Sequence, residues 1–229
     1  MIQSKRDAEG ILSSIWQNAF AYRYYFLLIS LLLTLLIPVL TQGQQEGFFW
    51  TISRSLVLIA CVNVLRRTKH ILILTLVLAA FTLGSEWFSF FHPESGYSHI
   101  PGFVPFGFFV VMISLEVFKN IIASNEIDMH IIVGAFCGFM LIGMIASLIF
   151  TFLHLINPHS FSNISPGMDG ANGILYFSFI TILTIGYGDI APLTEEARSV
   201  SIFFGLIGQF YLVVIMAVLV GKFLSKTDS

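Results

Sequence analysis

One short segment of this 229-residue chain has residue types that fit a specific chemistry: residues 184–189, which read Thr-Ile-Gly-Tyr-Gly-Asp. Gly186 and Gly188 can adopt positive φ at little cost, so neighbouring carbonyl groups can be turned toward one side of the backbone. The carbonyls from Thr184 to Tyr187, with the Thr184 hydroxyl below them, would then form a row of oxygen atoms. Four such rows around one axis make stacked oxygen rings that replace the hydration shell of a cation. The motif occurs once, so such rings require a homotetramer.

The stretch before this motif is too short to cross a bilayer. Residues 174–185 are apolar except for Ser178, Thr181 and Thr184, and glycines follow them, whereas a crossing helix needs about 20 mainly apolar residues. Irregular backbone at membrane depth is tolerated only where it is buried in protein or lines a cavity. We therefore expect a helix at 172–184 that enters the membrane and turns back. The alternative is a buried interfacial helix without a pathway, and the motif that follows favours the first interpretation.

The composition places the chain in a membrane. Apolar side chains make up 56% of the residues and charged ones 10%, whereas soluble chains carry roughly a quarter charged residues. Six apolar runs are long enough to span a hydrocarbon core of about 30 Å. These runs are 22–40, 48–65, 71–91, 102–118, 131–156 and 200–220. We expect an all-α integral membrane protein of fourfold assembly, with six transmembrane helices, the re-entrant pore helix and an extended selectivity filter.

Basic residues indicate the orientation, because cytoplasmic loops are enriched in Lys and Arg. The loops at 41–47 and 92–101 contain neither residue type. If six helices alternate across the membrane, nine of the eleven basic residues fall on the other side: Lys5, Arg6, Arg23, Arg66, Arg67, Lys69, Lys119, Lys222 and Lys226. We therefore expect a multi-pass protein of the cell membrane with both termini in the cytoplasm.

The motif and its surroundings resemble the tetrameric potassium channel superfamily, whose filter reads Thr-Val-Gly-Tyr-Gly-Asp. The resemblance covers roughly residues 131–222, and it implies a filter at 184–188 and an inner helix at 198–221. Ile185 replaces the usual valine, a mild exchange because the backbone carbonyl binds the ion. The tyrosine between the two glycines favours K⁺ over the non-selective relatives. The resemblance implies K⁺ sites at Thr184, Ile185, Gly186 and Tyr187, within a filter that Gly188 completes.

Residues of the pore helix are expected to support this filter. Tyr176 and Phe177 stand where relatives often have tryptophans, and they would form an aromatic cuff around Tyr187. Ile180 stands where some relatives have a glutamate that hydrogen-bonds the aspartate after the filter, so the way in which Asp189 is held stays open. The expected filter support and outer mouth comprise Tyr176, Phe177, Thr181 and Asp189.

The inner helix is expected to begin at a capping residue. Thr194 has the residue type of an N-cap, and Glu195 and Glu196 in the first turn would complement the helix dipole. Together with Asp189, fourfold repeated, these glutamates would also concentrate cations at the outer mouth. Gly208 lies within the helix, where the resembled family has a gating hinge. The alternative is that Gly208 permits close packing between helices.

The first four helices lack a voltage sensor of the usual kind. The run 102–118 contains no Arg or Lys, and the first basic residue after it is Lys119. Voltage sensors use three or four charges per subunit, each worth about 2.3 kcal/mol per 100 mV. Arg54 is the deep basic residue of these helices, and Glu86 lies at a similar depth one helix later. We expect an Arg54–Glu86 ion pair between the two helices; the alternative is that Arg54 snorkels to the headgroups.

The expected organisation follows from these elements. It comprises a short cytoplasmic N-terminus (1–21), a four-helix transmembrane domain without an arginine ladder (22–118), a cytoplasmic linker (119–130), the pore domain (131–224, with its outer helix at 131–156) and a tail (225–229). The linker either couples the two domains at the membrane interface or is a solvated turn with Ser124 or Asn125 capping the next helix. The ends are too short for a nucleotide- or calcium-sensing module, so gating by one is not expected.

The predicted function is that of a passive K⁺-selective channel in the lipid bilayer, with K⁺ as the permeant ligand and no cofactor. A weakly selective cation channel and a non-conducting, channel-derived scaffold are the alternatives, and a separate regulatory subunit stays open. An enzyme is not expected, because no Ser-His, Cys-His or His-Glu-x-x-His arrangement is present. The net charge of −2 argues against a basic nucleic-acid surface. Asn163-Ile164-Ser165 fits the glycosylation pattern, but the proline that follows argues against its use.

Overall fold

The structure, a computed structural model, describes residues 22–41, 46–65, 69–91, 100–124, 128–164 and 168–227. Within these ranges the chain forms helices and a single isolated β-bridge. The helices are α2 (Arg23–Thr41), α3 (Glu46–Leu65), α4 (Lys69–Phe91), α5 (Ile100–Ala123), α6 (Met129–Ile156), α7 (Met168–Ile182) and α8 (Glu195–Thr227). The all-helical prediction is confirmed. The expected termini at 1–21 and the loops around 42–45 and 92–99 lie outside the described residues.

Each of the six apolar runs corresponds to one of the long helices, although Tyr22 precedes α2, and the helix expected at 172–184 corresponds to α7, which ends two residues earlier. Among the described residues, four stretches are long and apolar enough to cross a membrane: Phe48–Leu65, Val104–Ala123, Met129–Ile156 and Glu195–Lys222. The described apolar parts of α2 and α4 are shorter, at Arg23–Ile37 and Leu72–Phe88. A crossing by all six helices therefore stays a prediction.

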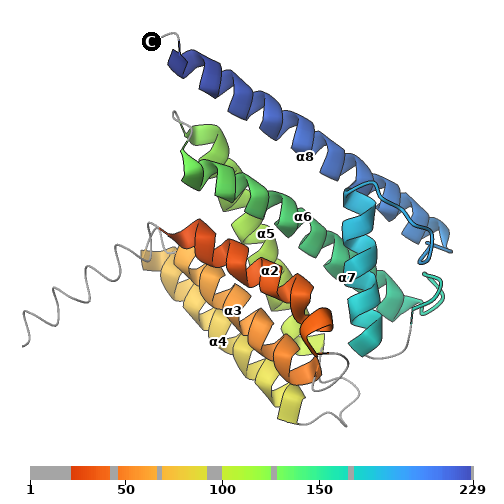
Figure 1. The fold of residues 1–229 in the computed structure, drawn as a ribbon. Coiled ribbons are helices and arrows are strands. Elements are labelled where there is room, and N and C mark those ends of the chain that lie inside the picture. The colour runs from red at the N-terminus through yellow and green to blue at the C-terminus, as the bar shows by residue number, and fades with distance from the viewer. Residues whose placement is uncertain are drawn as a thin grey trace, which may run out of the picture.

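Helix α6 lies between two groups of helices (Figure 1). On one side, α2 to α5 form a bundle in which each helix contacts the next, and both α2 and α5 also contact α6. On the other side, α7 and α8 contact α6 and each other. The outer helix of the expected pore domain is thus part of both groups.

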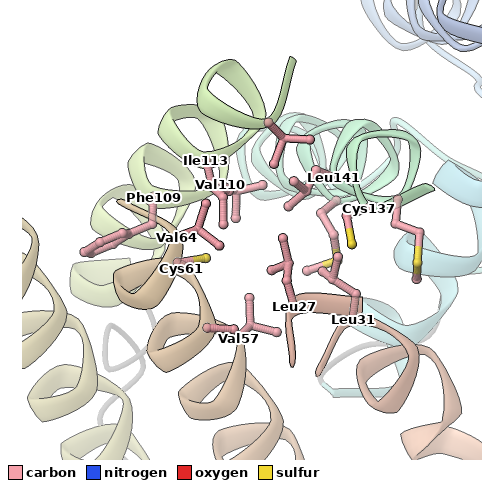
Figure 2. Close-up of a cluster of buried hydrophobic side chains, with 14 of the residues drawn as sticks. Leu27, Leu31, Val57, Cys61, Val64, Phe109, Val110, Ile113, Cys137 and Leu141 are labelled. Carbon is pink, nitrogen blue, oxygen red and sulfur yellow. The ribbon is translucent and has the colours of Figure 1, made fainter. Parts of the chain in front are cut away.

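Buried apolar side chains join α6 to the bundle (Figure 2). Leu27 of α2, Val57 of α3, Val110 of α5 and Leu141 of α6 are all fully buried in one cluster. Lipid tails are as apolar as these side chains, so close van der Waals packing within the cluster, and not removal from water, holds α6 on the bundle. The two cysteines, Cys61 and Cys137, are buried free thiols in this cluster.

Small residues on α6 let the last two helices approach it closely. A Cβ atom on Gly143 would lie 2.7 Å from the Phe179 ring of α7, and one on Gly138 would lie 2.1 Å from the Tyr211 hydroxyl of α8. The Tyr211 hydroxyl donates a hydrogen bond to the carbonyl of Ala135 at 2.8 Å. Glycines that permit such approach are typical of helix contacts in membranes, and here they fix α7 and α8 against α6.

The connection between α5 and α6 differs from the expected linker. The helix predicted to end at residue 118 continues to Ala123, so the linker is shorter than 119–130. The cap of α6 is Asp128, whose side chain accepts from the Ile131 amide at 2.9 Å. The prediction of Ser124 as this cap was wrong, because only a residue directly before the first turn can reach those amides; Asn125 lies outside the described residues.

The carbonyl end of α5 is bound by a lysine from the other end of the chain. The Lys222 ammonium of α8 donates to the carbonyls of Ile121 (2.9 Å), Ile122 (3.1 Å) and Ser124. The last carbonyls of a helix have no partner within the helix and carry a partial negative charge. Lys222 therefore links α8 directly to the last helix of the bundle.

Candidate functional site

Helix α7 is fixed by an aromatic cluster behind the Thr-Ile-Gly-Tyr-Gly motif. Phe177 is 5% exposed, and its ring lies 5.1 Å from that of Phe150 on α6 and 5.2 Å from that of Phe161. Ile174 and Ile180 on the same helix are also buried in this cluster. This cluster fixes the position of the C-terminal end of α7 relative to α6. The motif begins at that end of the helix.

The chain leaves α7 through a tight turn. The carbonyl of Ile180 accepts from the amides of Ile185 (2.9 Å) and Gly186 (3.3 Å), and the carbonyl of Thr181 accepts from the Thr184 amide (3.1 Å). These bonds satisfy carbonyls that a helix end would otherwise leave unpaired. They also fix where the motif begins relative to the helix axis.

Backbone angles alternate along the motif. Thr184, Gly186 and Gly188 have φ of 56°, 54° and 81°, while Ile185 and Tyr187 are not in the positive-φ region. Positive φ at every second residue is the conformation that the expected turning of the carbonyls toward one side requires. The row of carbonyl oxygens itself stays a prediction. The two glycines have the conformation that the sequence argument called for.

The left-handed conformation of Thr184 was not predicted from the sequence. A residue other than glycine at positive φ is uncommon, and strain of this kind costs of order 1–3 kcal/mol and clusters at functional sites. The signal available was the spacing, because Thr184 precedes Gly186 by the same two residues that separate Gly186 from Gly188.

The aspartate after the motif is held by the pore helix. The Tyr176 hydroxyl donates to Asp189 Oδ2 at 2.8 Å, and this hydrogen bond to the carboxylate raises the pKa of the Tyr176 phenol. Ile180, which stands at the position discussed for a glutamate, is 5% exposed in the aromatic cluster. The open question of how Asp189 is held is thus answered by Tyr176.

The other expected support residues have different surroundings. The Phe177 ring packs on Phe150 and Phe161, while Tyr187 is 72% exposed, so the structure does not bring Phe177 and Tyr187 together within one chain. The Thr181 hydroxyl donates to the carbonyl of Phe177 at 2.7 Å, within its own helix. The cuff around Tyr187 stays a prediction about the assembled protein.

The end of α7 packs closely on Gly208 of α8. A Cβ atom at this position would lie 2.8 Å from the carbonyl oxygen of Ile182 and 3.1 Å from its Cβ. Because backbone cannot move aside as a flexible side chain does, only glycine fits here. This observation favours the close-packing role of Gly208, and a hinge stays a prediction.

The beginning of α8 agrees with its predicted cap. The Thr194 hydroxyl accepts from the Ala197 amide at 3.2 Å, and Glu195 and Glu196 occupy the first turn. The Thr194 prediction is confirmed. With Asp189, these acidic residues follow the motif along the chain; their place at an outer mouth stays a prediction.

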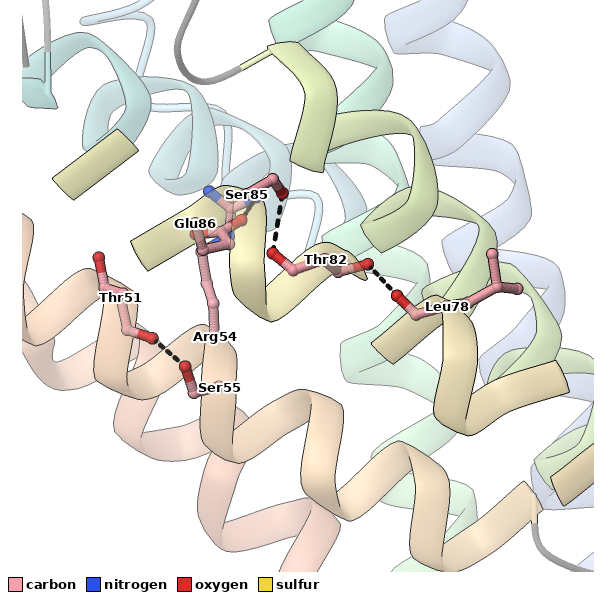
Figure 3. A network of polar contacts seen from close by, with 7 residues as sticks. All are labelled: Thr51, Arg54, Ser55, Leu78, Thr82, Ser85 and Glu86. Carbon is pink, nitrogen blue, oxygen red and sulfur yellow. Dashed lines mark hydrogen bonds and ion pairs between the residues drawn. The ribbon is translucent and has the colours of Figure 1, made fainter. Parts of the chain in front are cut away.

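Arg54 and Glu86 meet between α3 and α4 (Figure 3). The Arg54 Nη2 and Glu86 Oε1 atoms are 2.8 Å apart, and the two side chains are 23% and 10% exposed. The guanidinium also lies 4.7 Å from the centroid of the Phe106 ring of α5, a distance typical of cation–π contacts. Nearby hydroxyls, such as that of Thr82, bond carbonyls of their own helix. The structure thus brings Arg54 to Glu86 and places Phe106 against the pair.

Comparison with known proteins bears on this site. Residues 140–225, from within α6 to the end of α8, match the model of a family described as ion channel. Residues 140–225 form an ion channel pore domain. The domain includes α7, the motif and the inner helix, and its family is one of ion channels, not of enzymes. The chain is accordingly a multi-pass membrane protein.

Among curated proteins, a two-pore potassium channel (number 5) of Arabidopsis thaliana is 40% identical over 55 residues. The match covers 24% of this chain and 14% of the plant protein. The pore domain is therefore distantly related to potassium channels. No solved structure matches the chain.

Proposed function

We propose that the chain forms a homotetrameric, passive K⁺-selective channel. Dehydrated K⁺ passes through stacked rings made by the carbonyls of Thr184, Ile185, Gly186 and Tyr187 and by the Thr184 hydroxyl. The observation that carries the proposal is the positive φ at Thr184, Gly186 and Gly188, because this conformation at every second residue allows these oxygens to be turned to one side. Rings of carbonyl dipoles are the arrangement that K⁺ channels use for dehydrated ions.

The support of the filter favours selectivity for K⁺ over a loose cation pore. Glycines leave a backbone free to change shape, so the rings need contacts that hold their dimensions. The Tyr176–Asp189 hydrogen bond supplies one such contact, and the turn at Ile180 supplies another. The potassium channel named above as a relative points the same way.

The surfaces around the filter support a fourfold assembly. Ile185 and Tyr187 are 45% and 72% exposed in the single chain. A hollow of about 360 Å³ lies between the motif, the C-terminal half of α7 and Ser201 of α8. In the apolar stretch of α6 61% of the residues are buried, but in that of α8 only 18% are. Neighbouring copies around the pore axis would cover both the filter and α8.

The membrane layout completes the proposal. We infer six crossing helices, both termini in the cytoplasm of a cell, and an outer mouth at Asp189, Glu195 and Glu196. In the part of the chain that the structure describes, four helices meet the length and composition needed for crossing, and the basic residues follow the positive-inside pattern. Arg54 is paired with Glu86, so the pair carries no net charge through the membrane field and provides no gating charge.

Reconstitution tests the proposal. Purified protein in liposomes under a K⁺ gradient should carry a current whose reversal potential follows K⁺ and not Na⁺. Equal permeabilities would favour the weakly selective channel, and an absence of flux from intact tetramers would favour the scaffold.

A filter variant ties the current to the motif. Gly188→Ala should abolish the K⁺ current, because φ of 81° strains any residue with a Cβ. Gly84→Ala in α4 is the matched control, since a Cβ there meets nothing within 4 Å. Survival of the current in Gly188→Ala would contradict the proposal.

A further inference from the structure

A short segment after α6 lies against the chain that follows the filter. Residues 160–163, which we call the mouth strap, pair with residues 189–193, and one contact is an antiparallel β-bridge between Phe161 and Pro192. The hydrogen bonds run from the Ser162 amide to the Ala191 carbonyl (2.9 Å), from the Ala191 amide to the Ser162 hydroxyl (2.8 Å), and from the Leu193 amide to the Ser160 carbonyl (2.8 Å).

The mouth strap is fixed to the core of the pore domain. Phe161 is 4% exposed, and its ring lies 5.5 Å from that of Phe150 on α6 and 5.2 Å from that of Phe177 on α7. Ser160 is also buried, and its hydroxyl donates to the carbonyl of Leu153 at 3.3 Å. The position of the mouth strap is therefore fixed relative to α6 and α7, and residues that bond to the strap are held relative to these helices.

The last residue of the strap contacts the filter end directly. Asn163 Nδ2 donates to the main-chain carbonyl of Asp189 at 2.7 Å. Asn163 has φ of 53°, a left-handed conformation that asparagine tolerates better than most residues. Asp189 is thus held at two points, by Asn163 on its main chain and by Tyr176 on its carboxylate.

We propose that Asn163 is a positioning residue that keeps the filter in its conducting shape. The proposal rests on the proposed function. Gly188 leaves the backbone at the outer end of the filter free to rotate, and Asp189 is the next residue. A hydrogen bond from the core-anchored strap to the Asp189 carbonyl restrains that rotation and so keeps the outermost carbonyl ring open.

This role uses the same nitrogen that a glycan would occupy. Asn163-Ile164-Ser165 fits the glycosylation pattern, and attachment would place a bulky sugar on Nδ2, the atom that lies 2.7 Å from the Asp189 carbonyl. The geometry assigns this amide to the filter contact instead. The two roles are separable by mutation, because Ser165 is needed for the glycosylation pattern and not for the hydrogen bond.

The test compares two variants in the reconstituted channel. Asn163→Gly tolerates the positive φ but removes the donor, and Ser165→Ala keeps the donor but removes the glycosylation pattern. We expect the K⁺ current of Asn163→Gly to decline about two- to tenfold faster during sustained opening than the current of the unaltered channel. This range is the change in rate that corresponds to the free energy of one net hydrogen bond. Ser165→Ala should behave like the unaltered channel. High K⁺ on the outer side should slow the decline in Asn163→Gly, because bound ions hold the rings open.

The outcomes separate the inference from the proposed function. If the unaltered protein carries no K⁺ current, the proposed function fails and the inference fails with it. If the unaltered protein conducts and Asn163→Gly declines at the same rate, only the role of Asn163 is refuted. If Asn163→Gly does not assemble, the same measurement is made on Asn163→Asp, whose carboxylate would face the Asp189 carbonyl without a donor. If the current of Asn163→Asp declines at the rate of the unaltered channel, the role of Asn163 is equally refuted.

Discussion

The ion pair between α3 and α4 gives a sharp quantitative prediction. Removing one partner of a fully buried pair costs about 3–5 kcal/mol, whereas an exposed pair is worth about 0–1 kcal/mol. Arg54 and Glu86 are 23% and 10% exposed, so we expect a value between these limits. Glu86→Gln should lower the free energy of unfolding by about 2 kcal/mol. Arg54→Gln should cost about 0.5–1 kcal/mol more, because the contact with Phe106 is lost as well.

A double-mutant cycle in detergent micelles measures the coupling. Unfolding of Arg54→Gln, Glu86→Gln and the double variant is followed by circular dichroism during denaturant titration. The double variant should be little worse than Arg54→Gln, which leaves a coupling energy of about 1.5 kcal/mol. Lys119→Gln is the control, since Lys119 is exposed on α5 and should change the free energy by less than about 0.5 kcal/mol. Losses that add to within about 0.5 kcal/mol would refute the pair and favour snorkelling.

Two further changes test the contacts around the filter. Gly208→Ala should destabilise the protein by about 1–3 kcal/mol, because the new Cβ would lie 2.8 Å from the Ile182 carbonyl oxygen. Gly205→Ala is the control, since a Cβ there meets nothing within 4 Å. Equal thermal stability of the two variants would refute the packing role of Gly208. Tyr176→Phe removes the donor to the Asp189 carboxylate, so the reversal potential should shift toward that of a less selective pore. Tyr25→Phe, on α2, controls for the loss of a hydroxyl, and an unchanged reversal potential in Tyr176→Phe would contradict the role of this bond.

Local patterns predicted the helices and some of their ends. Six apolar runs gave six long helices, because a run of this length and composition has only one way to satisfy its backbone in an apolar solvent. Thr194 was predicted as a cap because capping depends on residues within one turn. The meeting of Arg54 and Glu86 followed from depth, since two neighbouring antiparallel helices bring similar depths together.

Contacts between distant parts of the chain could not be predicted in the same way. Asn163 and Asp189 are 26 residues apart, and the sequence around either residue does not indicate that the other is its partner. The contact of Lys222 with the end of α5 spans about 100 residues. Tyr176 and Phe177 were expected together in the aromatic cuff because both stand where relatives often have tryptophans, but adjacent residues of a helix point about 100° apart. One faces Asp189, and the other faces the aromatic cluster.

These long-range contacts determine how the bundle and the pore are connected. Helix α6 shares a buried cluster with α2, α3 and α5, so it is packed against the bundle along this cluster. The same helix carries Phe150, which anchors both the mouth strap and α7. At the other end of the molecule, Lys222 joins α8 to the carbonyl end of α5. A displacement of the bundle would therefore act on the filter through α6 and on the inner helix through Lys222, although the bundle has no arginine ladder to sense voltage.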